Sequence, residues 1–131
     1  SMFLQAMAAA RHADALTDGY LVVPRIHIYE RAFEAALADD TTWAAARDDL
    51  GLGTYARAEA EALTNNEFMV IAFSQVTGLD YRDFFAMWGI AISAAADAQV
   101  AAYGFPAVPR AFFAPLEHGH DRTFYVHVRT R

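Results

Sequence analysis

The sequence predicts a mainly α-helical protein, a compact bundle of about six or seven helices with a small C-terminal β-hairpin. Three observations support this fold class. Apolar residues recur at spacings of three and four through most of the chain, as in helices with one buried face. Residues typical of helix starts and glycines typical of helix ends separate these stretches. Only residues 106–131 change to the alternating pattern of a half-buried strand.

The first two helices are expected before residue 41. Residues 3–18 are rich in alanine, which has the highest helix propensity, and Gly19 would end this helix. A second helix is expected to start at Pro24, because a proline loses no hydrogen bond in the first helical turn, and to close at residues 39–40. One face of this helix carries four large apolar residues: Ile26, Tyr29, Phe33 and Leu37.

Two short helices are predicted next. Thr41 is expected to cap the first of them, which ends at Gly51 and has Trp43, Ala46 and Leu50 on one face. Gly53 and Thr54 begin the second. Its expected inner face consists of Tyr55, Ala58 and Ala62, opposite Arg57, Glu59 and Glu61.

The centre of the fold is expected from Thr64 onward. Thr64 and Glu67 have the spacing of a capping box, in which each side chain accepts a hydrogen bond from the other residue's backbone amide. The helix that they start is apolar over most of its circumference, which indicates a central position, and Gly78 would end it. Its predicted buried stripe is Phe68, Ile71, Ala72 and Gln75.

The remaining elements lie between Asp80 and the C-terminus. Asp80 is expected to cap a helix that stops at Gly89 and carries the aromatic residues Phe84, Phe85 and Trp88. Ser93 would cap the last helix, with Ala96, Val100 and Tyr103 facing inward. The runs 110–116 and 123–128 are the expected strands of the hairpin.

Length and composition favour one domain. The chain has 131 residues, of which 56% are hydrophobic, so it can form its own core. We expect a single domain over residues 3–131, with the helical bundle in 3–105 and the hairpin tail in 106–131. Ser1 and Met2 are typical of a remnant of an expression tag.

Several classes of function are disfavoured by composition. The 16 acidic residues against 10 basic ones give a net charge of -6, whereas a nucleic-acid-binding protein needs a basic surface. All basic residues are arginine and cysteine is absent, so Schiff-base lysines, catalytic thiols and cysteine zinc ligands are excluded. No apolar run reaches the length of a membrane span, and no basic-then-apolar signal peptide opens the chain.

The segment Ser74–Gly89 carries a family resemblance. It resembles a block of the form S-x-x-x-G-x-[DN]-L-x-x-F-F-x-x-W-G in the helical half of the catalytic domain of enhancin-like gluzincin metallopeptidases. This group includes bacterial mucin-degrading and immunomodulating metalloproteases. Tyr81 stands where the block has leucine. The matching residues are Ser74, Gly78, Asp80, Phe84, Phe85, Trp88 and Gly89, with weaker matches at Phe3, Leu4, Gln5, Arg31, Phe33 and Trp43.

The resemblance implies the helical C-terminal subdomain of a zinc metallopeptidase that acts on glycoproteins such as mucins, in a secreted or cell-surface bacterial protein. The HExxH zinc motif of the group is absent from this sequence. Its zinc ligands and catalytic glutamate would therefore come from an upstream segment, which becomes the expected partner together with the glycoprotein substrate. We expect no catalytic residue and no cofactor in this chain, which would be inactive alone and would shape the substrate cleft.

Four residues are candidates for substrate binding: His27, Glu30, Arg31 and Asn66. The first three lie on consecutive turns of one predicted helix, where the forked guanidinium of an arginine can hold a carboxylate. The alternative is a solvated helix face with weak ion pairs.

His118, His120 and His127 are weak candidates for a metal site, because imidazoles grouped in a turn and on the returning strand can bind zinc. An exposed hairpin tip is the alternative. If these histidines bind metal, the chain would be a small metal-dependent enzyme. A further alternative is a non-catalytic helical module that binds a protein or a glycan through its aromatic residues.

Overall fold

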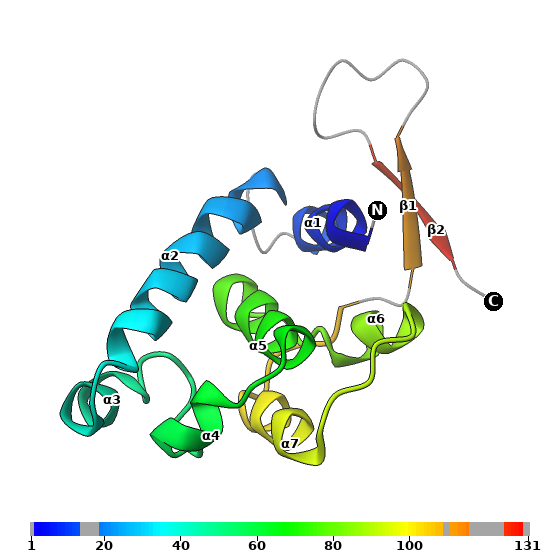
Figure 1. Ribbon diagram of the computed structural model, residues 1–131. Helices are drawn as coiled ribbons and strands as arrows, with labels where there is room; N and C mark the ends of the chain where they lie inside the picture. Colours follow the sequence, from blue (N-terminus) through cyan, green and yellow to red (C-terminus); the bar gives the residue numbers. More distant parts are fainter. Residues whose placement is uncertain (1, 14–18, 109–110, 116–124, 130–131) are drawn as a thin grey trace.

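The computed structural model describes residues 2–13, 19–108, 111–115 and 125–129 (Figure 1). The prediction of a mainly helical protein is confirmed. The described residues form seven α-helices and one 3₁₀ turn: α1 (Met2–His12), η1 (Gly19–Leu21), α2 (Val22–Ala36), α3 (Asp40–Ala46), α4 (Arg57–Glu61), α5 (Asn65–Thr77), α6 (Arg82–Met87) and α7 (Ala94–Ala102).

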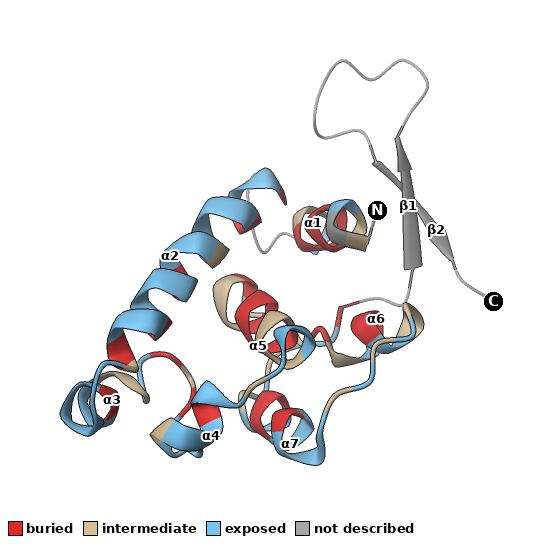
Figure 2. Cartoon of the chain, in the orientation of Figure 1, coloured by how far each residue is buried: buried red, intermediate tan, exposed pale blue. Residues whose placement is uncertain are grey.

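Helix α5 is the centre of the bundle and contacts both α2 and α7 (Figure 1). Its middle is buried on all sides, because Val70, Ile71, Ala72, Phe73 and Ser74 are at most 2% exposed. The inner sides of α2 and α7 supply the layers around it (Figure 2). The expected central position of this helix is therefore confirmed, although its buried surface is wider than the predicted stripe.

Both ends of α5 follow the sequence prediction. The Thr64 hydroxyl accepts a hydrogen bond from the Glu67 amide at 3.3 Å, and the Glu67 carboxylate accepts one from the Thr64 amide at 3.0 Å. Gly78 ends the helix with φ 70°, a left-handed conformation in which a Cβ would strain the backbone.

The second helix starts earlier than predicted. Helix α2 begins at Val22, so Pro24 is its third residue and not its first. The third position is tolerated for the same reason as the first, since the first amides of a helix have no partner within it. In α1, the described helix ends at His12, and residues 14–18 of the predicted helix lie outside the described residues.

Helices α3 and α4 also differ in detail from the prediction. Asp39 caps α3 in place of Thr41, because its carboxylate accepts from the Thr42 amide at 2.8 Å. Helix α4 is a single short turn that begins at Arg57. Its short length leaves one buried position, Ala60, while the predicted inner residues Ala58 and Ala62 are exposed.

Helix α7 has the predicted capping side chain, whereas α6 differs from the prediction. The N-cap residue of α6 is Tyr81, which makes no side-chain capping hydrogen bond, and Asp80 lies one residue before it, where its carboxylate accepts from the Arg82 amide at 3.0 Å. The Ser93 hydroxyl accepts from the Ala96 amide at 3.2 Å and so caps α7.

The C-terminal part contains two strands, β1 (Ala111–Pro115) and β2 (Tyr125–Arg129), which pair antiparallel with Ala111 opposite Arg129. Residues 116–124, which would join them, lie outside the described residues. The hairpin as a connected unit over 106–131 therefore stays a prediction.

Candidate functional site

The segment that carries the family resemblance forms the corner between α5 and α6. Ser74 is fully buried, and its hydroxyl accepts a hydrogen bond from the Tyr81 amide at 3.3 Å. Between them, Gly78 reverses the chain. The serine and the glycine of the motif thus fix a tight connection between two helices.

The aromatic residues of the same motif belong to the core. Phe84 and Phe85 are 0% and 1% exposed, and their rings pack against Phe73 and Tyr81 with centroid distances of 5.6 to 6.2 Å. These edge-on arrangements are a favoured geometry of aromatic pairs. Phe84 and Phe85 therefore serve packing and are not exposed for ligand stacking.

Tyr81 makes a contact that leucine could not make. Its hydroxyl donates a hydrogen bond of 2.8 Å to the carbonyl oxygen of Ala6, in α1. Burial raises the pKa of Tyr81 above its ordinary value, so it stays a neutral donor. Tyr81 thereby connects the start of α6 to the N-terminal helix.

The four predicted substrate-binding residues lie on the surface. The His27 and Glu30 side chains are 64% and 48% exposed, with 3.6 Å between His27 Nδ1 and Glu30 Oε2. A groove of about 150 Å³ runs between α2, α4 and the start of α5. Glu30 lines this groove, whereas His27, Arg31 and Asn66 are exposed and are not among its lining residues.

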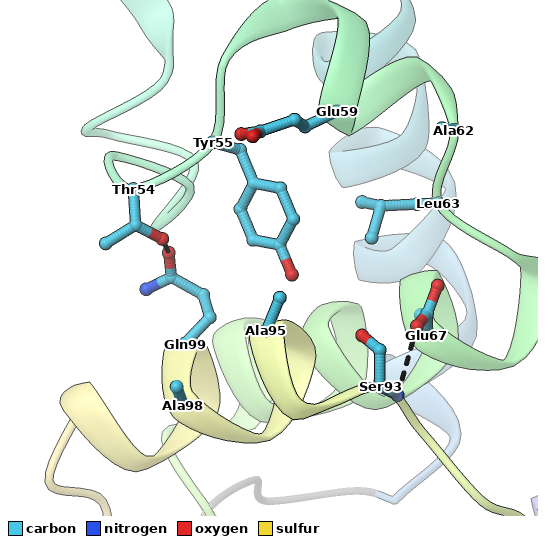
Figure 3. Close-up of a pocket in the computed structure, with 10 residues that line it drawn as sticks. All are labelled: Thr54, Tyr55, Glu59, Ala62, Leu63, Glu67, Ser93, Ala95, Ala98 and Gln99. Carbon is cyan, nitrogen blue, oxygen red and sulfur yellow. Dashed lines mark hydrogen bonds between the residues drawn. The ribbon is translucent and has the colours of Figure 1, made fainter.

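A larger pocket, of about 520 Å³, opens between α4, α5 and α7 (Figure 3). Sequence reasoning did not predict it, because its residues come from three separate parts of the chain. We refer to it as the α4–α7 pocket. It is lined by Thr54, Tyr55, Glu59, Ala62, Leu63, Glu67, Ser93, Ala95, Ala98 and Gln99.

Glu67 joins two helix starts at one side of the α4–α7 pocket. Its Oε2 accepts from the Thr64 amide at 3.0 Å, and its Oε1 accepts from the Ser93 amide at 3.1 Å (Figure 3). The hydrogen bonds from Ser93 and then from Thr64 lower the pKa of Glu67 below its ordinary value. The capping box was predictable from its spacing, but the contact with Ser93, 26 residues away, was not.

Tyr55 lies in the floor of the same pocket, with its hydroxyl directed towards α7 (Figure 3). The residue is 5% exposed, and among the described residues its hydroxyl has no hydrogen-bond partner. Burial, followed by the negative charges of Glu67 and Glu59, raises the pKa of Tyr55. A buried hydroxyl without a partner is unfavourable and indicates that a partner is missing.

The described residues contain no cluster of three histidines or carboxylates that could hold a metal ion. They therefore do not fit the zinc that the family resemblance implies. Of the candidate histidines, His118 and His120 lie outside the described residues, and His127 lies in β2, where side chains are not described. In the part of the chain that the structure describes, no helix is long and apolar enough to cross a membrane.

Comparisons with known proteins identify the chain as homologous to a segment of a larger metalloprotease. The relative is the immunomodulating metalloprotease of Pseudomonas aeruginosa (strain PAO1), which is 43% identical over 81 residues. This match covers 58% of the chain and 9% of the relative. No protein-family model matches the chain.

Comparison with solved structures also finds similarity to this metalloprotease. The structure of IMPa from Pseudomonas aeruginosa in complex with an O-glycopeptide superposes with a TM-score of 0.72 and 32% identity, over 92% of this chain and 14% of that one. The IMPa metallopeptidase in complex with T-antigen gives a TM-score of 0.70 and 30% identity, over 95% of this chain and 14% of that one. The predicted resemblance to the immunomodulating metalloprotease group is confirmed, and the chain spans only a small part of these relatives.

Proposed function

We propose that the chain is the helical subdomain of an enhancin-like gluzincin metallopeptidase that acts on glycoproteins such as mucins, in a secreted or cell-surface protein. The observation that carries this proposal is the similarity to IMPa, over nearly the whole chain, in a structure described as a complex with an O-glycopeptide. In this proposal, residues 3–131 form one unit whose tail is a hairpin. Zinc and the residues that activate water belong to an upstream segment.

The part played by this chain is to shape the substrate cleft. The polar row of α2, with Glu30 at the edge of the groove between α2, α4 and α5, supplies charged groups on a rigid helix. Arg31 would hold a carboxylate of a glycan or peptide by its two-pronged donor geometry. His27 and Asn66, both exposed nearby, would donate and accept hydrogen bonds at the same edge.

Joining the chain to its native upstream sequence tests the activity. If that polypeptide contains an HExxH segment, it is expected to cleave O-glycosylated mucin-type proteins, whereas the chain by itself leaves them intact. Mass spectrometry of the products would identify the cleavage sites. Intact mucin after treatment with the zinc-loaded longer polypeptide would count against the proposal.

The cleft role has its own test in the same active polypeptide. Arg31→Ala is expected to raise KM for a sialylated glycopeptide about three- to tenfold and to leave kcat nearly unchanged, because it removes a binding contact. Arg25→Ala is the matched control, since Arg25 is also exposed on α2 but lines the opposite groove with Ile28 and Val76. Equal effects of the two variants would exclude a specific role for the polar row.

A further inference from the structure

We propose that the α4–α7 pocket binds an alkylammonium group, the chemistry shared by a lysine side chain and a small free amine. This inference goes beyond the proposed function, because it concerns a site on the other side of α4 from the groove of α2. The volume, about 520 Å³, lies within the roughly 300–1,000 Å³ of typical ligand sites.

The charge in the pocket is negative. Glu59 and Glu67 line it, and none of its lining residues is basic. The neighbouring basic residue of α4, Arg57, is already bound elsewhere: its Nε donates to Asp40 at 2.7 Å and its Nη1 to the Leu37 carbonyl at 3.1 Å. Two carboxylates without a basic side chain among the lining residues favour a cation in the pocket.

An anion would find few donors there, although three helices begin beside the pocket. A carboxylate already accepts from the N-cap amide of each of these helices. Glu59 accepts from the Ala56 amide at 2.9 Å, and Glu67 accepts from the amides of Thr64 and Ser93. The positive ends of the helices thus already face carboxylates of this pocket, which makes them less attractive to an anion.

Tyr55 supplies an independent indication of a missing occupant. Its hydroxyl is buried, has no partner among the described residues and points towards α7, at the opposite end of the ring from the Glu59 carboxylate (Figure 3). A hydroxyl oxygen accepts a hydrogen bond from an ammonium group, which carries three donors and no acceptor. An ammonium ion beside the hydroxyl would thus give it a partner, and the carboxylates that line the pocket would attract its charge.

The remaining wall fits the carbon chain of such a ligand. Four lining residues are small or aliphatic and come from the C-terminal end of α4 and from α7: Ala62, Leu63, Ala95 and Ala98. Methylene groups of an alkylammonium pack on small apolar side chains while the charged end reaches the carboxylates. A lysine side chain or a short free amine has this combination of a flexible stem and a compact charge.

The experiment is a titration of the ¹⁵N-labelled 131-residue chain with n-butylammonium chloride, followed by NMR at constant ionic strength. Saturable amide shifts are expected at residues 54–67 and 93–99. n-Butanol, with the same stem but no charge, and sodium chloride are expected to produce no saturable shifts there. N-acetyl-lysine methylamide, compared with n-butylammonium, distinguishes the two sources: tighter binding of the lysine derivative indicates a peptide partner, and binding of the small amine alone indicates a free amine.

Two variants and one control complete the test. Glu59→Gln is expected to weaken n-butylammonium binding about three- to tenfold, because it removes one of the two negative charges that line the pocket, and Tyr55→Phe about threefold, because it removes the hydroxyl that accepts from the ammonium group. Glu61→Gln makes the same charge change on α4 but outside the α4–α7 pocket, and should leave binding unchanged. Absence of saturable shifts, equal shifts with n-butanol, or tighter binding of neutral galactose would overturn the proposal.

Discussion

Glu67 shows how one side chain can serve two helices. Each carboxylate oxygen accepts from the start of a different helix, α5 or α7, so the two elements are held together by a single residue. The hydrogen bonds from Ser93 and then from Thr64 favour the ionised carboxylate and lower the pKa of Glu67. A glutamine has only one acceptor oxygen and would turn its amide donor towards a second donor.

Glu67→Gln is accordingly expected to lower the free energy of unfolding by about 1–2 kcal/mol at pH 7. Because the folded pKa lies below the ordinary value of 4.5, the contribution is present above that pH and is lost as the pH falls through the folded pKa. Urea unfolding of the wild-type chain and of the Glu67→Gln variant, at pH 7 and at pH 3, measures the difference in their free energies of unfolding. The difference in stability should shrink in acid, and a constant difference would contradict the role of ionisation.

The hydroxyl of Tyr81 links the start of α6 to α1. Tyr81→Phe removes the hydroxyl that donates to Ala6 and should cost about 1–2 kcal/mol of stability. Hydrogen exchange is expected to accelerate mainly in α1. Tyr29→Phe is the matched control, because the Tyr29 hydroxyl is also buried and donates to a carbonyl, that of Leu50 at 2.7 Å. If both variants loosened α1 equally, the specific link from Tyr81 to α1 would be disproved.

The boundaries of a helix could be predicted from the sequence where residues close to its ends determine them. The start and end of α5 follow from Thr64, Glu67 and Gly78, which act within a few residues of the helix. Helix α4 was predicted less well, because it is a single turn whose inner side is determined by packing of Tyr55 and Ala60 against other helices. A pattern of apolar residues over so few positions does not fix which side faces the core.

Gly51, in the connection between α3 and α4, lies close to two side chains from other parts of the chain. Gly51 has φ 71°, and its carbonyl accepts a hydrogen bond from the Tyr103 hydroxyl. A Cβ there would overlap the Gln75 amide and lie 2.9 Å from the Tyr103 oxygen, whereas a Cβ on Gly78 would meet nothing within 4 Å. Gly51→Ala is therefore expected to cost about 2–3 kcal/mol and Gly78→Ala about 1 kcal/mol. Urea unfolding would reveal the difference, and equal losses would show that the loop adapts freely.

At the scale of the whole molecule, the sequence predicted the family better than the site. The motif from Ser74 to Gly89 is local, and its residues are constrained by packing, so it could be recognised without a structure. The α4–α7 pocket could not, because Tyr55, Glu67 and Gln99 meet only after the bundle has formed. Of the four predicted substrate-binding residues, Glu30 lines the groove between α2, α4 and α5, and the other three are not among its lining residues, since periodicity gives the helix face but not the neighbouring helix.

The chain as a whole is expected to hold no tightly bound zinc, because the metal belongs to the upstream segment in the proposed enzyme. Elemental analysis before and after chelation, with circular dichroism to confirm the helical fold, checks this. Replacement of His118, His120 and His127 by alanine should leave the metal content unchanged. One zinc per chain that is lost in this triple variant would assign a metal site to the tail.

The packing of Trp43 also gives the protein an internal optical reporter. Trp43 is 3% exposed, and its indole nitrogen donates to the Tyr55 carbonyl at 3.0 Å, next to the floor of the α4–α7 pocket. The chain has only one other tryptophan, Trp88, which lies at the end of α6. With Trp88 replaced by phenylalanine, the fluorescence would come from Trp43 alone. A shift in the wavelength of its emission maximum would then report structural change around α3 and α4 in real time, without any attached dye.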